Sequence, residues 1–94
     1  MGNFYTYILY SCSLKKFYTG HSNDTTERLR RHNSGKVNST KNGVPWFLIT
    51  EFIHSTKSEA ASLEIKIKKR GAKRYLEDIA FSFEEFISRS SSAG

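Results

Sequence analysis

Apolar and aromatic residues along this chain form three short runs that read as strands. The runs 4–11, 17–21 and 45–52 are dense in aromatic and β-branched residues, which are favoured in strands. In 4–11 the apolar residues occupy both alternating positions, so we predict a central strand covered on both faces. Pro45 opens the third run, where its missing backbone N–H is tolerated.

The polar stretches between these runs predict where the first helix begins and ends. Asp24 and Glu27 have the spacing of a capping box, and Asn33-Ser34 followed by Gly35 supplies a stop signal. The polar residues 36–44 show no periodicity and are expected to form a loop.

Two further helices are predicted after the third strand. Ser55 or Thr56 can cap a helix that ends near Gly71, and a short helix follows over about 73–79. The element order β-β-α-β-α-α, with a short first connection, implies an α/β (α+β) fold. We expect a small three-stranded antiparallel sheet flanked by helices.

The length of 94 residues supports a single domain, assigned to residues 1–80. Residues 81–94 are expected to form a C-terminal extension that ends in a disordered Ser-rich tail. The single cysteine, Cys12, cannot form an internal disulfide or build a zinc site alone. Without an apolar run of bilayer length or a signal peptide, we expect a cytoplasmic protein that does not contact membranes.

The charge balance adds a prediction about partners. Fifteen Lys and Arg against nine Asp and Glu give a formal net charge of +6. A small basic domain attracts polyanions, above all nucleic acid. The alternative is a solvated basic surface that only aids solubility.

Glu64 occupies an unusual position on the second predicted helix. At about 100° per residue it falls inside an apolar arc. The arc is formed by Ala60, Ala61, Leu63, Ile65 and Ile67. A carboxylate placed there needs a partner, which is either a metal ion or the ammonium group of Lys68, four residues later.

Arg28 and His32 are four residues apart and therefore share one face of the first helix. The Arg28 guanidinium suits a phosphate, and His32 can bond a phosphate or carry a proton. Because Arg30 and Arg31 adjoin them, a solvated basic face is the competing interpretation.

Tyr7 and Tyr18 lie on the two strands of the predicted hairpin, where tyrosines usually pack in the core or across strands. Gly20 near the end of the second strand permits a close backbone approach or a turn. These three residues carry no functional signal by themselves.

As an ordered set, the residues resemble the GIY-YIG nuclease domain family, especially its small single-domain members. The residues that match the family motifs are Tyr5-Thr6-Tyr7, Tyr18-Thr19-Gly20, Arg28-Leu29-x-x-His32-Asn33 and Glu64. The match covers about residues 4–79. Tyr5 and Thr6 stand where the first family motif has glycine and isoleucine, and Thr19 replaces isoleucine in the second.

The resemblance implies an endonuclease that hydrolyses DNA with one metal ion. It makes Tyr7, Tyr18, Arg28, His32 and Glu64 the catalytic residues. Glu64 would bind Mg²⁺ or Mn²⁺, and Tyr7 would be the general base. An ordinary tyrosine pKa of about 10 makes that role difficult without nearby positive charge.

The expected substrate is nucleic acid, DNA rather than RNA, with low or structure-based specificity. The residues expected to contact it are Gly20, Arg28, Arg31, Lys36 and Lys68. Two alternatives stay open at this point. One is a module of the same fold that binds nucleic acid without cutting it, and the other is a small α/β interaction protein.

Overall fold

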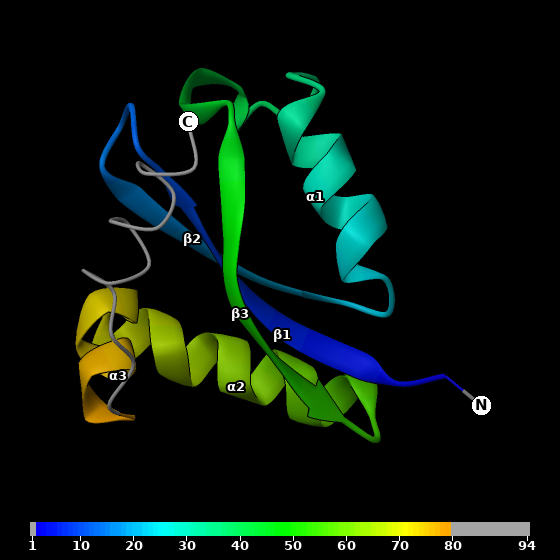
Figure 1. Ribbon diagram of the computed structural model, residues 1–94. Helices are drawn as coiled ribbons and strands as arrows, with labels where there is room; N and C mark the ends of the chain where they lie inside the picture. Colours follow the sequence, from blue (N-terminus) through cyan, green and yellow to red (C-terminus); the bar gives the residue numbers. More distant parts are fainter. Residues whose placement is uncertain (1, 80–94) are drawn as a thin grey trace.

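The computed structural model describes residues 2–79, and the predicted extension 81–94 lies outside them (Figure 1). The elements in chain order are β1 (Phe4–Ser11), β2 (Lys16–Ser22), α1 (Thr25–Asn33), the 3₁₀ helix η1 (Lys41–Gly43), β3 (Trp46–His54), α2 (Lys57–Arg70) and α3 (Ala72–Asp78). Within the described part of the chain, no helix is long and apolar enough to cross a bilayer.

The three strands form one antiparallel sheet in the order β2-β1-β3, which confirms the predicted fold class. The central strand β1 was predicted to be covered on both faces, and its residues Thr6 to Leu9 are all buried. The β1–β3 register shifts between Ile8 and Leu9, so that Ile49 has no opposite residue on β1.

Helices cover the two faces of the sheet with separate apolar clusters (Figure 1). On one face, Ile8 packs with Ile67 of α2 and Leu76 of α3. On the other face, Tyr7 and Leu9 pack with Trp46, and Leu29 of α1 lies against this group. Alternation along β1 explains the division, because adjacent side chains point to opposite faces.

The helices begin and end close to the capping and stop residues that the sequence predicts. The Asp24 side chain accepts a hydrogen bond from the Glu27 backbone N–H, but the Glu27 carboxylate binds Arg30 instead of completing the predicted capping box. Thr56 and Glu59 do form a complete capping box at the start of α2. Gly71, with φ of +91°, ends α2 in a conformation that favours glycine.

Two predictions were wrong in detail. The segment 36–44 was expected to be an irregular loop, but it contains η1. Ile65 was placed in the apolar arc of α2, yet it is 56% exposed. The sheet contacts a narrower stripe of α2 than the arc, centred on Ala60 and Ile67, which are fully buried.

Candidate active site

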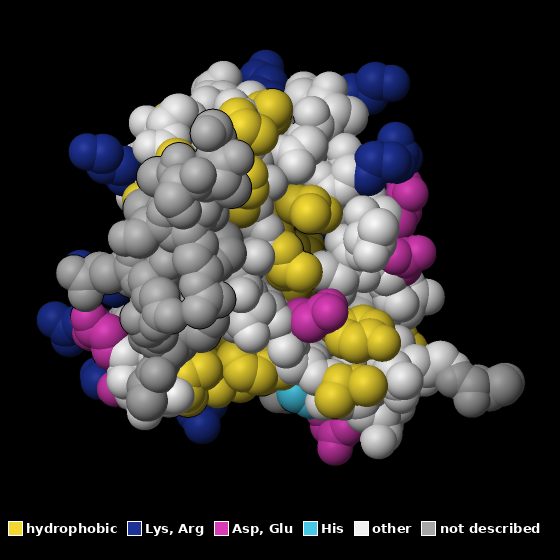
Figure 2. Space-filling view, in the orientation of Figure 1, with side chains coloured by type: hydrophobic (Ala, Val, Ile, Leu, Met, Phe, Trp, Pro, Cys, Tyr) yellow, Lys and Arg dark blue, Asp and Glu magenta, His cyan; other side chains and the backbone are white. Residues whose placement is uncertain are grey.

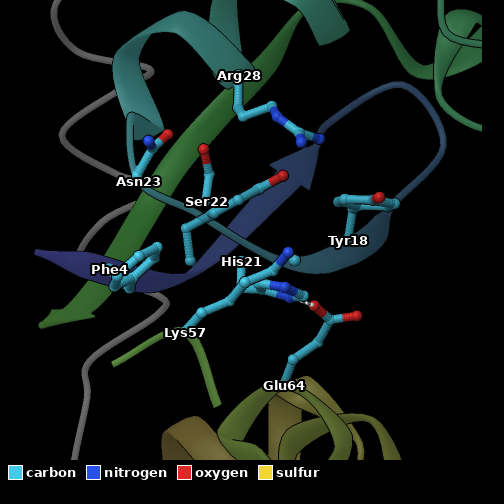
Figure 3. Close-up of a pocket in the computed structure, with 10 residues that line it drawn as sticks. Phe4, Tyr18, His21, Ser22, Asn23, Arg28, Lys57 and Glu64 are labelled. Carbon is cyan, nitrogen blue, oxygen red and sulfur yellow. Dashed lines mark hydrogen bonds and ion pairs between the residues drawn. The ribbon is translucent and has the colours of Figure 1, made fainter. Parts of the chain in front are cut away.

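An open cleft lies beside β2, between α1 and α2, with a volume of about 420 Å³ (Figure 3). Of the five residues predicted to be catalytic, four line it: Tyr7, Tyr18, Arg28 and Glu64. Gly20 lines it as well. The other residues around the cleft are Phe4, His21, Ser22, Asn23 and Lys57. Four separate elements therefore bring the predicted residues to one place.

The phenol ring of Tyr7 lies directly over Gly20. The two residues are Cα partners in the β1–β2 ladder. A Cβ at position 20 would lie 2.6 Å from the Tyr7 hydroxyl oxygen and 2.8 Å from Cζ. Any side chain larger than hydrogen would therefore push the ring away. Gly20 is therefore needed for this close approach. It lies within β2 and forms no turn.

The Tyr7 hydroxyl is held from behind by a buried hydrogen-bonded chain. Its oxygen lies 3.2 Å from Nε2 of His32, and Nδ1 of His32 lies 2.8 Å from Oγ1 of Thr40. His32 is only 3% exposed, so the interpretation of a solvated histidine on a basic helix face is wrong. It does not line the cleft and reaches it through Tyr7.

Burial keeps the side chains of Tyr7 and His32 neutral near pH 7. Burial is the main cause that raises the pKa of Tyr7 to about 12, with smaller contributions from Tyr18 and Glu64, while Arg28 opposes the rise. Burial also lowers the pKa of His32, and the positive charges of Arg28 and Arg31 lower it further. Arg28 supplies the positive charge that a tyrosinate at position 7 would need. Its effect on the pKa of Tyr7 is smaller than the opposing effect of burial.

Arg28 and Tyr18 complete the wall of the cleft next to α1. Arg28 is exposed, and Figure 3 shows its guanidinium extending from α1 into the open side of the cleft. The Tyr18 ring lies 4.7 Å from the ring of His32 and 6.4 Å from that of Tyr7, measured between centroids. The exposed Arg28 guanidinium therefore stands beside a packed aromatic group, which is suited to holding an anion near the Tyr7 hydroxyl.

Glu64 faces the cleft from α2, and both of its oxygens have partners. Oε1 lies 2.6 Å from Nδ1 of His21, and Oε2 accepts a hydrogen bond of 2.6 Å from Nζ of Lys68. The predicted i,i+4 pair with Lys68 is thus present. Burial alone would raise the pKa of Glu64, but hydrogen bonds from Lys68 and His21 lower it below its usual value. The carboxylate stays ionised.

An ionised carboxylate in an open polar cleft fits a divalent cation. Its side chain is 17% exposed, and the Lys68 side chain that holds Oε2 is 54% exposed and able to move away. In residues 2–79, no group of three or more His, Cys, Asp and Glu converges as a ready-made metal site. Water and substrate oxygens would therefore supply most of the coordination, as Mg²⁺ usually requires.

Three of the predicted substrate contacts do not line this cleft. Lys68 contacts the cleft only through its Glu64 carboxylate. Arg31 and Lys36 line a smaller depression at the C-terminal end of α1, together with Arg30, Ser34 and Val37. In Figure 2 the Lys and Arg side chains stand around the margins of the visible face, while apolar side chains follow its middle. The exposed apolar residues of β3 include Phe47 and Ile53. The basic charge is thus spread over several surfaces.

Sequence reasoning missed His21 and Lys57. His21 directly follows Gly20, so strand alternation turns its side chain away from Tyr18 and Gly20 and toward α2. Lys57 begins α2 and lies seven residues before Glu64, on the same side of the helix. Spacing along each element carried this signal, but only knowledge of the neighbouring element shows that both side chains reach the cleft.

The chain is similar to known proteins over most of its length. The GIY-YIG catalytic domain family matches residues 3–91. UPF0213 protein YsiG of Lactococcus lactis is 40% identical over 65 residues, which cover 68% of this chain and 62% of that protein. The aligned part is thus less than two thirds of the Lactococcus protein. UPF0213 protein SH2523 of Staphylococcus haemolyticus is 36% identical over 69 residues, which cover 72% of this chain and 83% of that protein.

A solved structure has the same fold. The solution NMR structure of UPF0213 protein BH0048 from Bacillus halodurans aligns with a TM-score of 0.53 and 31% identity. The alignment covers 88% of this chain and 90% of that chain. The family match over most of the sequence, and the similarity in sequence and fold to these relatives, show that this protein belongs to the GIY-YIG family, among its small UPF0213 members.

Proposed function

We propose that this protein is a metal-dependent endonuclease that hydrolyses DNA phosphodiester bonds with one divalent ion. The observation that carries the proposal is the convergence of Tyr7, Arg28 and Glu64 on one open polar cleft from three different elements. Membership of a nuclease family agrees with this chemistry. Mg²⁺ or Mn²⁺ bound at Glu64 would stabilise the negative charge that develops on the phosphate and the leaving oxygen.

Arg28 binds and orients the scissile phosphate in this proposal. Its exposed guanidinium is aimed into the cleft and has no ion pair among the described residues. A planar fork of donors fits two phosphate oxygens at once. Because the cleft is partly enclosed, this charge interaction is stronger than it would be in open water.

Tyr7 accepts the proton of the attacking water without first becoming a tyrosinate. With a pKa of about 12, almost no Tyr7 is ionised at neutral pH. The chain to Thr40 offers another route: if His32 donates Nδ1–H to Thr40 Oγ1, its Nε2 is free to accept. Tyr7 then takes a proton from water while its own proton moves to His32. The lowered pKa of His32 keeps the imidazole neutral and ready to accept it.

The cleft favours low or structure-based specificity. It is small, and outside Tyr7 and Tyr18 its side chains that offer an aromatic face are limited to Phe4 and His21. Such faces stack on unpaired bases without reading their sequence. We therefore expect DNA with single-stranded or branched regions to be cut better than long uniform duplex, and DNA better than RNA.

The test is cleavage of end-labelled single-stranded, duplex, flap and branched DNA with Mg²⁺ or Mn²⁺, with and without EDTA. Glu64→Gln and Arg28→Ala are expected to reduce cleavage at least about 10³-fold, as loss of a charge-stabilising group does. Matched controls are Glu51→Gln on β3 and Arg74→Ala on α3, both exposed and away from the cleft. Full activity in either cleft variant, with its fold intact, would remove the site assignment.

One observation favours a second candidate, a nucleic-acid-binding module that does not cut. Both Glu64 oxygens are already satisfied by His21 and Lys68, as expected for a structural carboxylate. Such a module would retard DNA in a gel without cutting it at any Mg²⁺ or Mn²⁺ concentration. It would also bind DNA equally well in the Glu64→Gln variant.

A further inference from the structure

His21 makes a close contact in the cleft that the proposed mechanism does not use. It lies near the end of β2, on the strand face opposite to Gly20 and Tyr18. Its Nδ1 lies 2.6 Å from Oε1 of Glu64, although the two residues are 43 positions apart. Figure 3 shows the two side chains meeting across the space between β2 and α2. Both are partly accessible, with side chains 28% and 17% exposed.

We propose that His21 is a second protein ligand of the ion bound by Glu64, and that the site therefore prefers Mn²⁺ or a similar transition ion to Mg²⁺. This inference rests on the proposed function, because it takes Glu64 to be a metal ligand. It adds an imidazole nitrogen to a site that would otherwise contain a single carboxylate.

The separation of the two side chains suits a shared ion. Neighbouring ligands at about 2.1 Å from an octahedral ion lie about 3 Å apart. The observed 2.6 Å between Nδ1 and Oε1 needs to widen by only a few tenths of an ångström to reach that value. Neutral imidazole binds metals through either ring nitrogen, so Nδ1 is a competent ligand once its hydrogen bond to Glu64 is released.

The other two histidines are committed elsewhere. Both ring nitrogens of His32 are engaged, by Tyr7 and by Thr40. Nε2 of His54 is hydrogen-bonded to Thr6, and His54 does not line the cleft. Among the three histidines of the chain, His21 alone is presented to the carboxylate.

Ligand chemistry then determines the preferred ion. Mg²⁺ favours oxygen ligands, whereas imidazole suits first-row transition ions. Lys68 occupies the other Glu64 oxygen, but its side chain is half exposed and can leave without disturbing the helix. One imidazole and one carboxylate leave several coordination positions open for water and a substrate phosphate.

The test uses Mn²⁺ bound to the whole protein and does not depend on activity. Pulsed electron paramagnetic resonance detects a directly bound histidine nitrogen as ¹⁴N modulation. Wild-type protein is expected to show this modulation, and protein labelled with [¹⁵N]histidine is expected to show the ¹⁵N pattern in its place. This comparison needs no substitution and therefore cannot fail through misfolding.

Variants assign the nitrogen to a residue. His21→Gln is expected to remove the modulation and to weaken Mn²⁺ binding at least about tenfold, while Mg²⁺ affinity changes much less. The matched control His54→Gln should leave both unchanged. Because a histidine in the outer shell also affects affinity by about 10- to 100-fold, the nitrogen modulation decides between the two positions.

Three outcomes separate this inference from the proposed function. Modulation that disappears in His21→Gln supports the second ligand. Mn²⁺ that binds wild-type protein but not Glu64→Gln, without any histidine modulation, overturns the second ligand and leaves the proposed function in place. Wild-type protein that binds no Mn²⁺ overturns both.

Discussion

The two walls of the cleft hold their polar groups in opposite states, neutral on one wall and ionised on the other. On the wall next to α1, called here the neutral wall, Tyr7 and the His32 ring behind it are almost completely buried and are kept neutral by burial. On the wall next to α2, called here the ionised wall, Glu64 is partly accessible and is kept ionised by His21 and Lys68. β2 runs between them, with Gly20 facing one wall and His21 the other.

For the proposed function, this difference assigns proton transfer and metal binding to opposite sides of a single edge strand. Proton transfer benefits from neutral groups whose pKa values are set by burial and by a hydrogen-bonded chain. Metal binding needs a charge that stays ionised and can exchange its partners. Alternation along β2 keeps the two environments about one residue apart without mixing them.

On the neutral wall, the largest effect is expected from removing the Tyr7 hydroxyl. Tyr7→Phe keeps the ring that packs over Gly20 but breaks the contact with His32. Loss of a positioned proton acceptor should reduce cleavage by about 10²- to 10⁴-fold. Single-turnover rates measured over pH 6–9 check this, with Tyr5→Phe as the matched strand control. An unchanged rate would remove Tyr7 as the base.

Gly20→Ala tests whether the position of the same hydroxyl matters. The new Cβ would meet the Tyr7 hydroxyl oxygen at 2.6 Å, so the buried ring has to move. We expect cleavage to fall by about 10²-fold, as a shift of about 1 Å can cause, and stability to fall by about 1–3 kcal/mol. Cleavage rates and urea unfolding measure both quantities.

The matched control for that substitution is Gly2→Ala, because a Cβ at Gly2 meets nothing within 4 Å. Its activity and stability should be those of the wild type. If Gly20→Ala also cuts DNA at the wild-type rate, the position of the Tyr7 ring matters less for cleavage than the residues of the ionised wall.

A pH titration measures the burial of Tyr7 directly. Its pKa is about 12 in the folded protein and 10.0 as the reference, so the folded state binds the proton more tightly. The resulting stability is complete below pH 10 and is lost as pH rises toward 12. It amounts to up to about 2–3 kcal/mol. The free energy of unfolding of the wild type should therefore fall by that amount relative to Tyr7→Phe over that window.

The titration has its own internal check. Tyrosinate absorbance should show an ionisation step near pH 12, and this step should be missing in Tyr7→Phe. A Tyr7 that ionises near its reference pKa of 10.0 would mean that the neutral wall admits water and resembles the ionised wall.

The smallest effect is expected from the basic residues that lie outside both walls. Arg31→Ala and Lys36→Ala should each weaken DNA binding by less than tenfold at moderate salt. Each should also reduce the slope of log affinity against log salt by about 1. Fluorescence anisotropy over a range of salt concentrations checks this, with Lys73→Ala on α3 as control. No change in slope would confine binding to the cleft.

The sequence by itself determined the strands, the helix ends and the ordered family motif. Those features depend on near neighbours: the apolar run 4–11, a cap at Ser55 or Thr56 and the stop at Gly71. The ordered residues Tyr7, Tyr18, Gly20, Arg28 and Glu64 were also recognisable from the sequence, and all of them line one cleft.

Only the tertiary structure decided what these residues touch. Helical phase placed Ile65 in an apolar arc and left His32 on an open face, but the sheet covers His32 and leaves Ile65 exposed. The pairing of His21 with Glu64 joins elements 43 residues apart, which no local pattern reports. The physical reason is that periodicity describes one element at a time, whereas burial and pKa depend on the element packed against it.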